Sequence, residues 1–133
     1  MPTVRLLRDD ELSPRAAAVF AEIRRVRQTD FVNNFWRALA HDEALLERTW
    51  AGVQAVMAPG ALDAKTKEML YLAVSVAHGC EYCIHSHSTA ARARGMSEAE
   101  FMELVAVVGM ASETNRIVQA LGVPVDERFK AAI

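Results

Sequence analysis

Apolar residues recur three and four positions apart along most of the chain, which is the spacing of an amphipathic helix. Ser13 followed by Pro14 predicts the start of the first helix, and the apolar positions then continue to about Gln28. A shorter helix is expected over residues 34–40. The N-terminal part of the chain is therefore predicted to be helical.

The remaining helix boundaries are marked by side chains that cap helices and by residues that end them. They predict one helix from the cap Asp42 to the stop at Pro59 and Gly60, and a second over residues 64 to about 78 after the cap Asp63. They predict a third helix from about Cys80 to Arg94, before Gly95, and a last one from the capping box of Ser97 and Glu100 to the stop at Gly122 and Pro124. The last region is expected either to continue or to bend near Gly109. The helix over residues 64–78 is apolar nearly all round after Glu68, which predicts that it is buried on most sides.

No segment shows the alternation of a β-strand, so the sequence predicts an all-α fold. With 133 residues and a 52% apolar composition, a single compact domain of about six helices over residues 1–133 is expected. No glycine-rich phosphate loop follows a strand, which argues against a Rossmann or P-loop nucleotide site. A chain this small and apolar is also expected to bury surface between the subunits of a homo-oligomer.

The charge balance gives no general attraction to nucleic acid or to an anionic membrane, because the net charge is −2. The local basic cluster of Arg24, Arg25 and Arg27 is interpreted as a solvated helix face. The N-terminus lacks the apolar core of a secretory signal, and the most apolar run, residues 69–77, is too short to span a bilayer. We therefore expect a cytoplasmic protein without a nucleic-acid or membrane partner.

The segment HGCEYCIHSH, residues 78–87, holds both cysteines of the chain and three of its four histidines. On a helix, Cys80, Cys83 and His87 fall on one face, whereas His85 falls on the opposite face. Because Cys83 and His87 are four residues apart, the imidazole can reach the thiol and accept its proton, which leaves the nucleophilic thiolate. Cys80 and Cys83 lie one turn apart at a helix start, a spacing that supports a dithiol–disulfide cycle.

A base of this kind needs a group that orients it, and the preceding helix offers Glu68. On one continuous helix Glu68 would lie about 18 Å from Cys80, too far to cooperate. A hairpin at Gly79 would instead return His87 to about the level of Tyr71, roughly one turn or about 5 Å from Glu68 along the axis. The sequence therefore predicts a line from a nucleophile to a base to an orienting carboxylate. Cys83 is favoured as the nucleophile and Cys80 as the resolving partner, but the opposite order stays open.

Glu68, eleven further residues and then the pattern Cys80-x-x-Cys83-x-x-x-His87 resemble the motif of the alkyl hydroperoxidase D family, within the wider carboxymuconolactone decarboxylase-like fold. The family context extends over about residues 40–122, including the NRIVQALG segment. The resemblance implies an all-helical protein, usually a trimer or hexamer, that reduces hydroperoxides in antioxidant defence and takes electrons from a thiol reductant or a redox partner protein. It implies that Glu68 and His87 relay protons to the redox pair of Cys80 and Cys83. We expect no cofactor and no metal.

Two features differ from the characterised members of that family. They have a histidine at the position of Tyr82, and they are longer, two-lobed chains. Tyr82 is therefore a candidate auxiliary residue that either donates a hydrogen bond or simply packs. True carboxymuconolactone decarboxylases generally lack the cysteine pair, so a decarboxylase-like activity is the less favoured alternative.

Zinc binding is the main rival interpretation of the same residues. Cys80, Cys83 and His87 could supply three ligands, with Glu68, His78 or His85 as a fourth, although no second cysteine pair exists elsewhere in the chain. Covalent haem is disfavoured because Ile84 occupies the position at which that motif requires histidine.

Two interpretations without catalysis also stay open. The cysteines and His87 could be ordinary core residues, which is how we interpret the remaining histidines, His41, His78 and His85. Alternatively, a non-enzymatic redox sensor or assembly protein would use the same disulfide as a switch. Steady-state consumption of peroxide separates such a switch from an enzyme.

Overall fold

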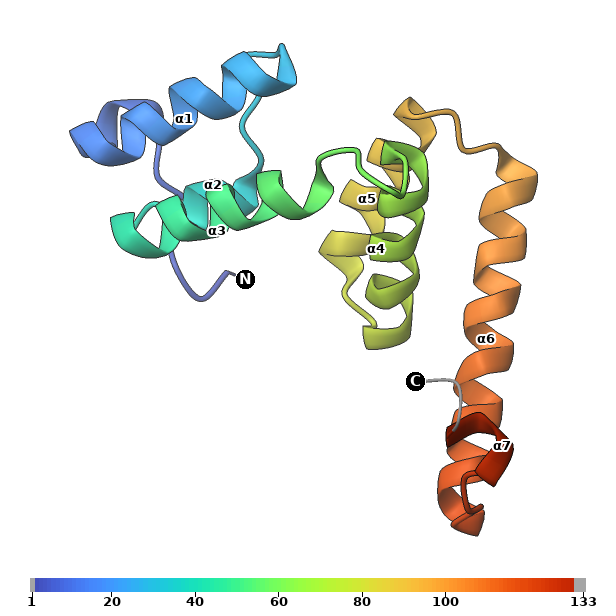
Figure 1. Cartoon of the computed structure of the whole chain (residues 1–133). Coiled ribbons are helices and arrows are strands. Elements are labelled where there is room, and N and C mark those ends of the chain that lie inside the picture. The colour runs from blue at the N-terminus through green and yellow to red at the C-terminus, as the bar shows by residue number, and fades with distance from the viewer. Residues whose placement is uncertain (1, 131–133) are drawn as a thin grey trace. The chain divides into compact units, whose positions relative to one another are not determined.

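The chain is all-helical in a computed structural model that describes residues 2–130 (Figure 1). In these residues a short 3-10 turn, η1 (Asp9–Glu11), precedes the helices α1 (Pro14–Arg27), α2 (Asn34–Leu39), α3 (Glu43–Met57), α4 (Ala64–His78), α5 (Glu81–Ala93), α6 (Glu98–Leu121) and α7 (Glu127–Lys130). The all-α prediction is confirmed, and α7 is one helix beyond the number expected. Within the described residues every helix is too short or too polar to cross a lipid bilayer. The expected cytoplasmic location stays a prediction.

The main helices begin at the capping side chains that the sequence predicts. Ser13, Asp42, Asp63 and Ser97 each accept a hydrogen bond from the backbone N–H three residues further on. At α6 the capping box is complete, because the side chain of Glu100 also accepts the N–H of Ser97. These bonds satisfy N–H groups that have no partner within the helix, and so they favour a helix start at each of these residues. The four predicted starts are confirmed.

The chain divides into two compact units, Met1–Ala58 and Pro59–Ile133, and each has its own apolar core. In the first unit α1 and α2 pack on α3, and Trp36 meets Trp50 edge to face with ring centroids 5.4 Å apart. The buried core of this unit consists of Ala16, Phe20, Ile23, Val32, Trp36, Ala40, Leu46 and Trp50. A single domain spanning both units stays a prediction.

The basic cluster at the end of α1 is more than a solvated helix face. The guanidinium of Arg27 lies 5.7 Å and 5.4 Å from the ring centroids of Trp36 and Trp50, within the range of a cation–π contact. Arg24 forms an ion pair with Asp9. Arg24 therefore pairs with η1, and Arg27, although exposed, lies over the two tryptophans, so these two side chains make contacts that the interpretation as a solvated face did not include.

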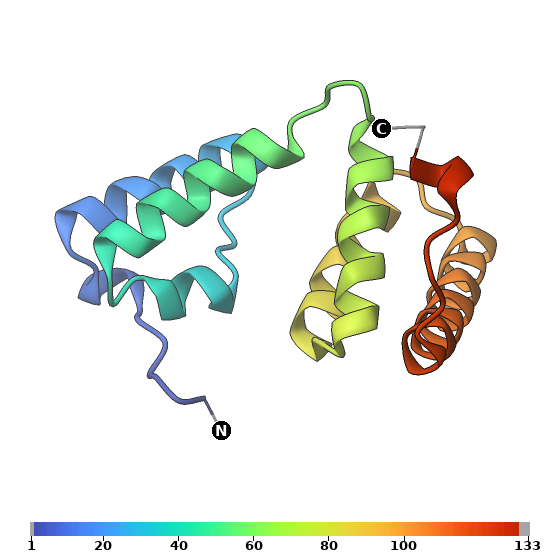
Figure 2. The same ribbon diagram turned by 60° about the horizontal axis from the view of Figure 1, so that its bottom comes forward.

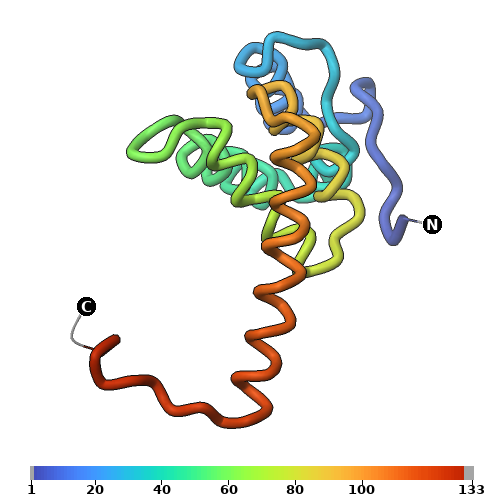
Figure 3. Tube along the Cα trace, turned by 90° about the vertical axis from the view of Figure 1, so that its right-hand side faces the viewer, coloured from blue at the N-terminus to red at the C-terminus, as the bar shows by residue number. Residues whose placement is uncertain are grey.

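In the second unit α4 and α5 form a hairpin, and α6 packs against α4 (Figure 2). Its buried core consists of Leu72, Ala91, Met96 and Leu104, with Met69, Ala73, Val76, Ile84, Phe101 and Val108 packed against it. The helix α6 continues through Gly109 without a bend, so continuation is the correct alternative of the two expected. After Val108 its side chains are mostly exposed, and this half of α6 extends beyond the hairpin (Figure 3).

The helix α4 is less buried than its composition predicts. Leu72 is fully buried and Ser75 nearly so, but Leu70 and Val74 are 52% and 56% exposed. The expectation that α4 is buried on most sides is therefore wrong for this chain. The physical reason is that α5 and α6 cover only part of its circumference in the second unit.

Candidate active site

The start of α4 fixes the position of Glu68. The carboxylate of Asp63 accepts the backbone N–H of Thr66 over 2.7 Å, and this hydrogen bond holds the pKa of Asp63 below its usual value of 3.8. Glu68 follows within the second turn of the helix, and its side chain is only 15% exposed. The carboxylate is thus held on a regular helix rather than on a mobile loop.

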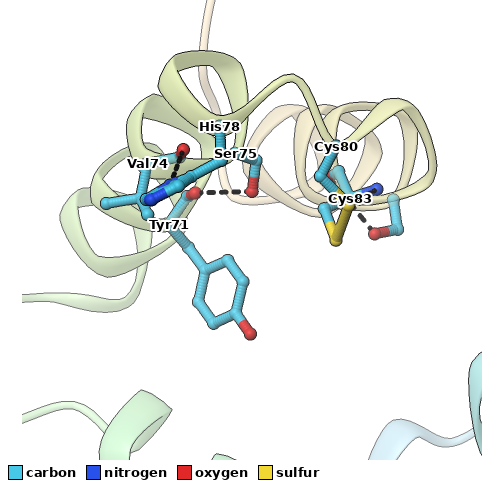
Figure 4. Close-up of a disulfide and its surroundings, with 7 residues drawn as sticks. Tyr71, Val74, Ser75, His78, Cys80 and Cys83 are labelled. Carbon is cyan, nitrogen blue, oxygen red and sulfur yellow. Dashed lines mark hydrogen bonds between the residues drawn. A yellow bond between two sulfur atoms is a disulfide. The ribbon is translucent and has the colours of Figure 1, made fainter.

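Gly79 reverses the chain between α4 and α5. Its φ of 68° and ψ of 29° are left-handed, a conformation that glycine adopts without the steric cost of a Cβ. The N–H groups of Gly79 and Cys80 donate to the carbonyls of Val76 and Ser75, which satisfies the last turn of α4. The hydroxyl of the buried Ser75 also donates to the carbonyl of Tyr71 over 2.8 Å, so Ser75 links the turn to the helix before it (Figure 4).

Cys80 and Cys83 form a disulfide across the first turn of α5, with their Cα atoms 5.3 Å apart (Figure 4). Cys80 is the N-cap of α5, and its sulfur accepts the backbone N–H of Cys83 over 3.3 Å. A sulfur at this position lies at the positive end of the helix dipole, where negative charge is favoured. The expected proximity of the two cysteines is confirmed.

His87 lies four residues after Cys83 on α5, and its Nδ1 donates a hydrogen bond to Oε2 of Glu68 over 2.8 Å. The two side chains are 22% and 15% exposed, so the pair is largely shielded from water. The expectation that a hairpin at Gly79 brings Glu68 to His87 is confirmed, and no bridging water is required. Because Glu68 engages Nδ1, the other ring nitrogen, Nε2, is the one left to exchange a proton.

Tyr71 also lies at this pair, although it was not among the residues expected at the site. Its ring stacks on the imidazole of His87, with centroids 3.8 Å apart and an angle of 22° between the ring planes. The predicted hairpin put His87 at about the level of Tyr71, and Tyr71 follows Glu68 by three residues on the same side of α4, but this spacing does not specify that the two rings stack.

The other histidines lie outside this constellation. The ring of His78 donates to the carbonyl of Val74, four residues before it, and the ring of His41 donates to the carbonyl of Arg5 in the first unit. His85 is exposed, as expected of the opposite face of α5. All three side chains are exposed, so the interpretation of these histidines as core residues is wrong. That they have no role in the site stays a prediction.

The remaining candidates are the zinc ligands and Tyr82. Among residues 2–130, no group of three or more His, Cys, Asp or Glu side chains gathers closely enough to hold a metal ion. Tyr82 lies between the two cysteines in sequence, on the exposed side of the first turn of α5, with 44% of its surface exposed. Its expected auxiliary role stays a prediction.

Comparisons with known proteins agree with this architecture. A family model described as the carboxymuconolactone decarboxylase family matches residues 43–126. A crystal structure described as the alkylhydroperoxidase AhpD core from Rhodospirillum rubrum is 56% identical in sequence to this chain. The match covers 97% of each of the two chains, and the structures superpose with a TM-score of 0.93. A curated relative, described as uncharacterized protein 4 in the cox locus of Paracoccus denitrificans, is 38% identical over 50 residues. That match covers 38% of this chain and 45% of the relative.

Proposed function

The chain belongs to the carboxymuconolactone decarboxylase family, as the motif resemblance implied, and on that premise we propose that it is a thiol-dependent peroxidase for alkyl hydroperoxides. The observation that carries the proposal is the hydrogen bond from His87 to Glu68 on the same helix pair as the disulfide. A structural disulfide needs no oriented base beside it, whereas a thiol that must lose its proton does. The relative described as an alkylhydroperoxidase core, at 56% identity, supports the same choice.

In the first step of the proposed cycle, His87 takes the proton of the Cys83 thiol at Nε2, while Glu68 holds Nδ1 and balances the positive charge. The Cys83 thiolate attacks the terminal oxygen of the hydroperoxide, so an S–O bond forms and the O–O bond breaks. The alkoxide that leaves takes the proton from His87. The products are the alcohol and a sulfenic acid on Cys83, which carries the oxidation.

In the second step the Cys80 sulfur attacks the sulfenic sulfur of Cys83. The S–S bond forms, the S–O bond breaks, and the hydroxyl takes the proton of the Cys80 thiol and leaves as water, which produces the disulfide seen in the structure. An external dithiol then returns two electrons and two protons, either as a small molecule or from a redox partner protein. One cycle therefore converts a hydroperoxide and a dithiol to an alcohol, water and a disulfide.

The position of Cys80 at the helix N-cap supports this division of roles. When a reductant attacks the sulfur of Cys83, the sulfur of Cys80 leaves as a thiolate, and the N–H of Cys83 at the positive helix end stabilises it. His87 serves the other sulfur, because it follows Cys83 by one turn of α5. The helix N-terminus thus stabilises the thiolate of Cys80, and His87 accepts the proton of Cys83.

The proposal is tested by steady-state consumption of cumene hydroperoxide with dithiothreitol as the reductant, together with a metal analysis of the purified protein. We expect turnover in the wild type and its loss in Cys80→Ser and in Cys83→Ser. One oxidation per chain without turnover would instead favour a redox switch, and stoichiometric zinc would contradict the redox cycle. A decarboxylase activity, which the family description names, gives the cysteine pair no role.

We also propose that the protein is a homo-oligomer, since the family resemblance implies a trimer or hexamer. Apolar side chains are exposed in a row along α6 and after it, at Met102, Val107, Met110, Ile117, Val118, Leu121, Val123, Val125 and Phe129. A protein that stays monomeric rarely exposes so many apolar side chains on one helix and the segment after it, and a second copy of the chain offers a matching apolar face to cover them. Light scattering after size-exclusion chromatography tests this, and a monomer at all concentrations would contradict it.

A further inference from the structure

The stacking contact between Tyr71 and His87 is a feature of the site that the proposed cycle does not use. The two rings lie nearly parallel, with centroids 3.8 Å apart. Glu68 and Tyr71 project from the same face of α4, so one helix supplies both the hydrogen-bond partner of the imidazole and the ring against its face. His87 is therefore held by a hydrogen bond at the edge of its ring, to Glu68, and by a stacking contact on the face of its ring, with Tyr71.

We propose that Tyr71 is a positioning residue that holds the His87 imidazole in the orientation that directs Nε2 to the reacting groups. This inference rests on the proposed peroxidase function. A single hydrogen bond at Nδ1 leaves the ring able to rotate about the axis of that bond. The stacked phenol blocks this rotation, because turning the imidazole out of plane would drive it into the Tyr71 ring at the observed separation.

The surroundings of Tyr71 suit it to this role. Its carbonyl accepts the hydroxyl of the buried Ser75, whose own carbonyl accepts the N–H of Cys80, so the backbone of Tyr71 is tied to the turn that carries the disulfide. In Figure 4 the Tyr71 ring extends from α4 on the side toward which the disulfide sulfurs also point. Its side chain is 39% exposed, so the contact with His87 does not depend on burial in the core.

The contact also acts when the imidazole carries the transferred proton. A positive charge over the face of a phenol ring is attracted by the negative potential of that face. Phenylalanine presents the same face, whereas an aliphatic side chain does not. The effect of Tyr71 is therefore expected to come from its ring rather than from its hydroxyl group.

The test compares Tyr71→Leu with Tyr71→Phe, which is the matched control because it keeps the ring. We expect Tyr71→Leu to lower kcat about three- to tenfold with little change in KM, and Tyr71→Phe to retain the wild-type values. In the Cys80→Ser background, alkylation of reduced Cys83 by iodoacetamide should slow by a similar factor in Tyr71→Leu alone. The NMR signals of the His87 ring protons should lose their upfield ring-current shift in Tyr71→Leu and keep it in Tyr71→Phe.

Two results would overturn the inference. If Tyr71→Phe is impaired as much as Tyr71→Leu, the hydroxyl group acts instead of the stacked ring. If Tyr71→Leu keeps both wild-type kcat and the wild-type alkylation rate, the stacking positions nothing. Failure of the proposed function is a different outcome, since wild-type protein would then consume no hydroperoxide, while the alkylation rates and ring-current shifts would still report on Tyr71.

Discussion

Nδ1 of His87 lies 2.8 Å from Oε2 of Glu68, although the two residues are 19 positions apart and belong to different helices. The contact exists because the left-handed turn at Gly79 returns α5 alongside α4. It joins a carboxylate and an imidazole that are both largely shielded from water. The proposed proton transfer depends on this pair and on the turn that creates it.

Replacing Glu68 by glutamine tests the role of the carboxylate. Glutamine retains the size of the side chain but removes the charge that balances a protonated His87, so kcat should fall roughly 10- to 100-fold in the peroxide assay. The control is Glu113→Gln on the exposed side of α6, which should leave kcat unchanged. Equal activity of Glu68→Gln and the wild type would show that the pair has no part in proton transfer.

The two single cysteine variants separate the attacking sulfur from the resolving one. With hydroperoxide, Cys80→Ser should form one sulfenic acid on Cys83, because His87 still serves that thiol, but it should not turn over. Cys83→Ser should form none at a comparable rate. Trapping with dimedone followed by mass spectrometry measures this, and sulfenic acid found only in Cys83→Ser would assign the attack to Cys80.

The same change from glycine to alanine should have opposite effects at two positions. A Cβ added at Gly109, within α6, would have no atom outside its own stretch of helix within 4 Å, so Gly109→Ala should stabilise the fold by about 0.5–1 kcal/mol. Gly79 also has room, but its φ of 68° disfavours a side chain, so Gly79→Ala should cost about 1–2 kcal/mol. Urea unfolding measures both, and a stabilising Gly79→Ala would argue against the left-handed turn.

The ion pair between α4 and α6 should make stability depend on pH. Lys65 donates to Glu100 over 2.6 Å, and this bond, together with the N–H of Ser97, holds the pKa of Glu100 below its usual value of 4.5. Because the pKa is lower in the folded state, the carboxylate stabilises the fold above about pH 4.5, and this contribution is lost as the pH falls through the folded-state value.

Glu100→Gln isolates that charge, because glutamine can still complete the capping box. Its melting temperature should lie below that of the wild type at neutral pH, and the two should converge in acid. In a Lys65→Gln background, the effect of Glu100→Gln on the melting temperature at neutral pH should be smaller, because the ion pair is already absent. A gap between wild type and Glu100→Gln that is independent of pH would show that the charge of Glu100 does not stabilise the second unit.

Much of the fold was predictable because helix starts depend on local hydrogen bonds. The caps at Asp63 and Ser97 need only the next three residues, so sequence alone locates them. The meeting of Glu68 with His87 was predictable for a related reason, since a single glycine turn and the helical rise fix where α5 returns.

Contacts between side chains of different helices were harder to predict. The stacking of Tyr71 on His87 depends on the rotation of α5 about its own axis, which periodicity does not specify. The exposure of Leu70 and Val74 was also missed, because an apolar helix surface does not reveal which neighbour covers it. The placement of Arg27 over two tryptophans was missed since a charge run gives no sign of an aromatic partner.

The most direct test of the peroxidase proposal is an anaerobic titration of the fully reduced protein with cumene hydroperoxide. Protein thiols are counted by alkylation and mass spectrometry, and the alcohol product is measured by chromatography. We expect each equivalent of hydroperoxide to convert one pair of thiols to the disulfide of Cys80 and Cys83 and to release one equivalent of cumyl alcohol, repeatedly when dithiothreitol is present. Protein that retains both thiols after the addition of hydroperoxide would contradict the proposal.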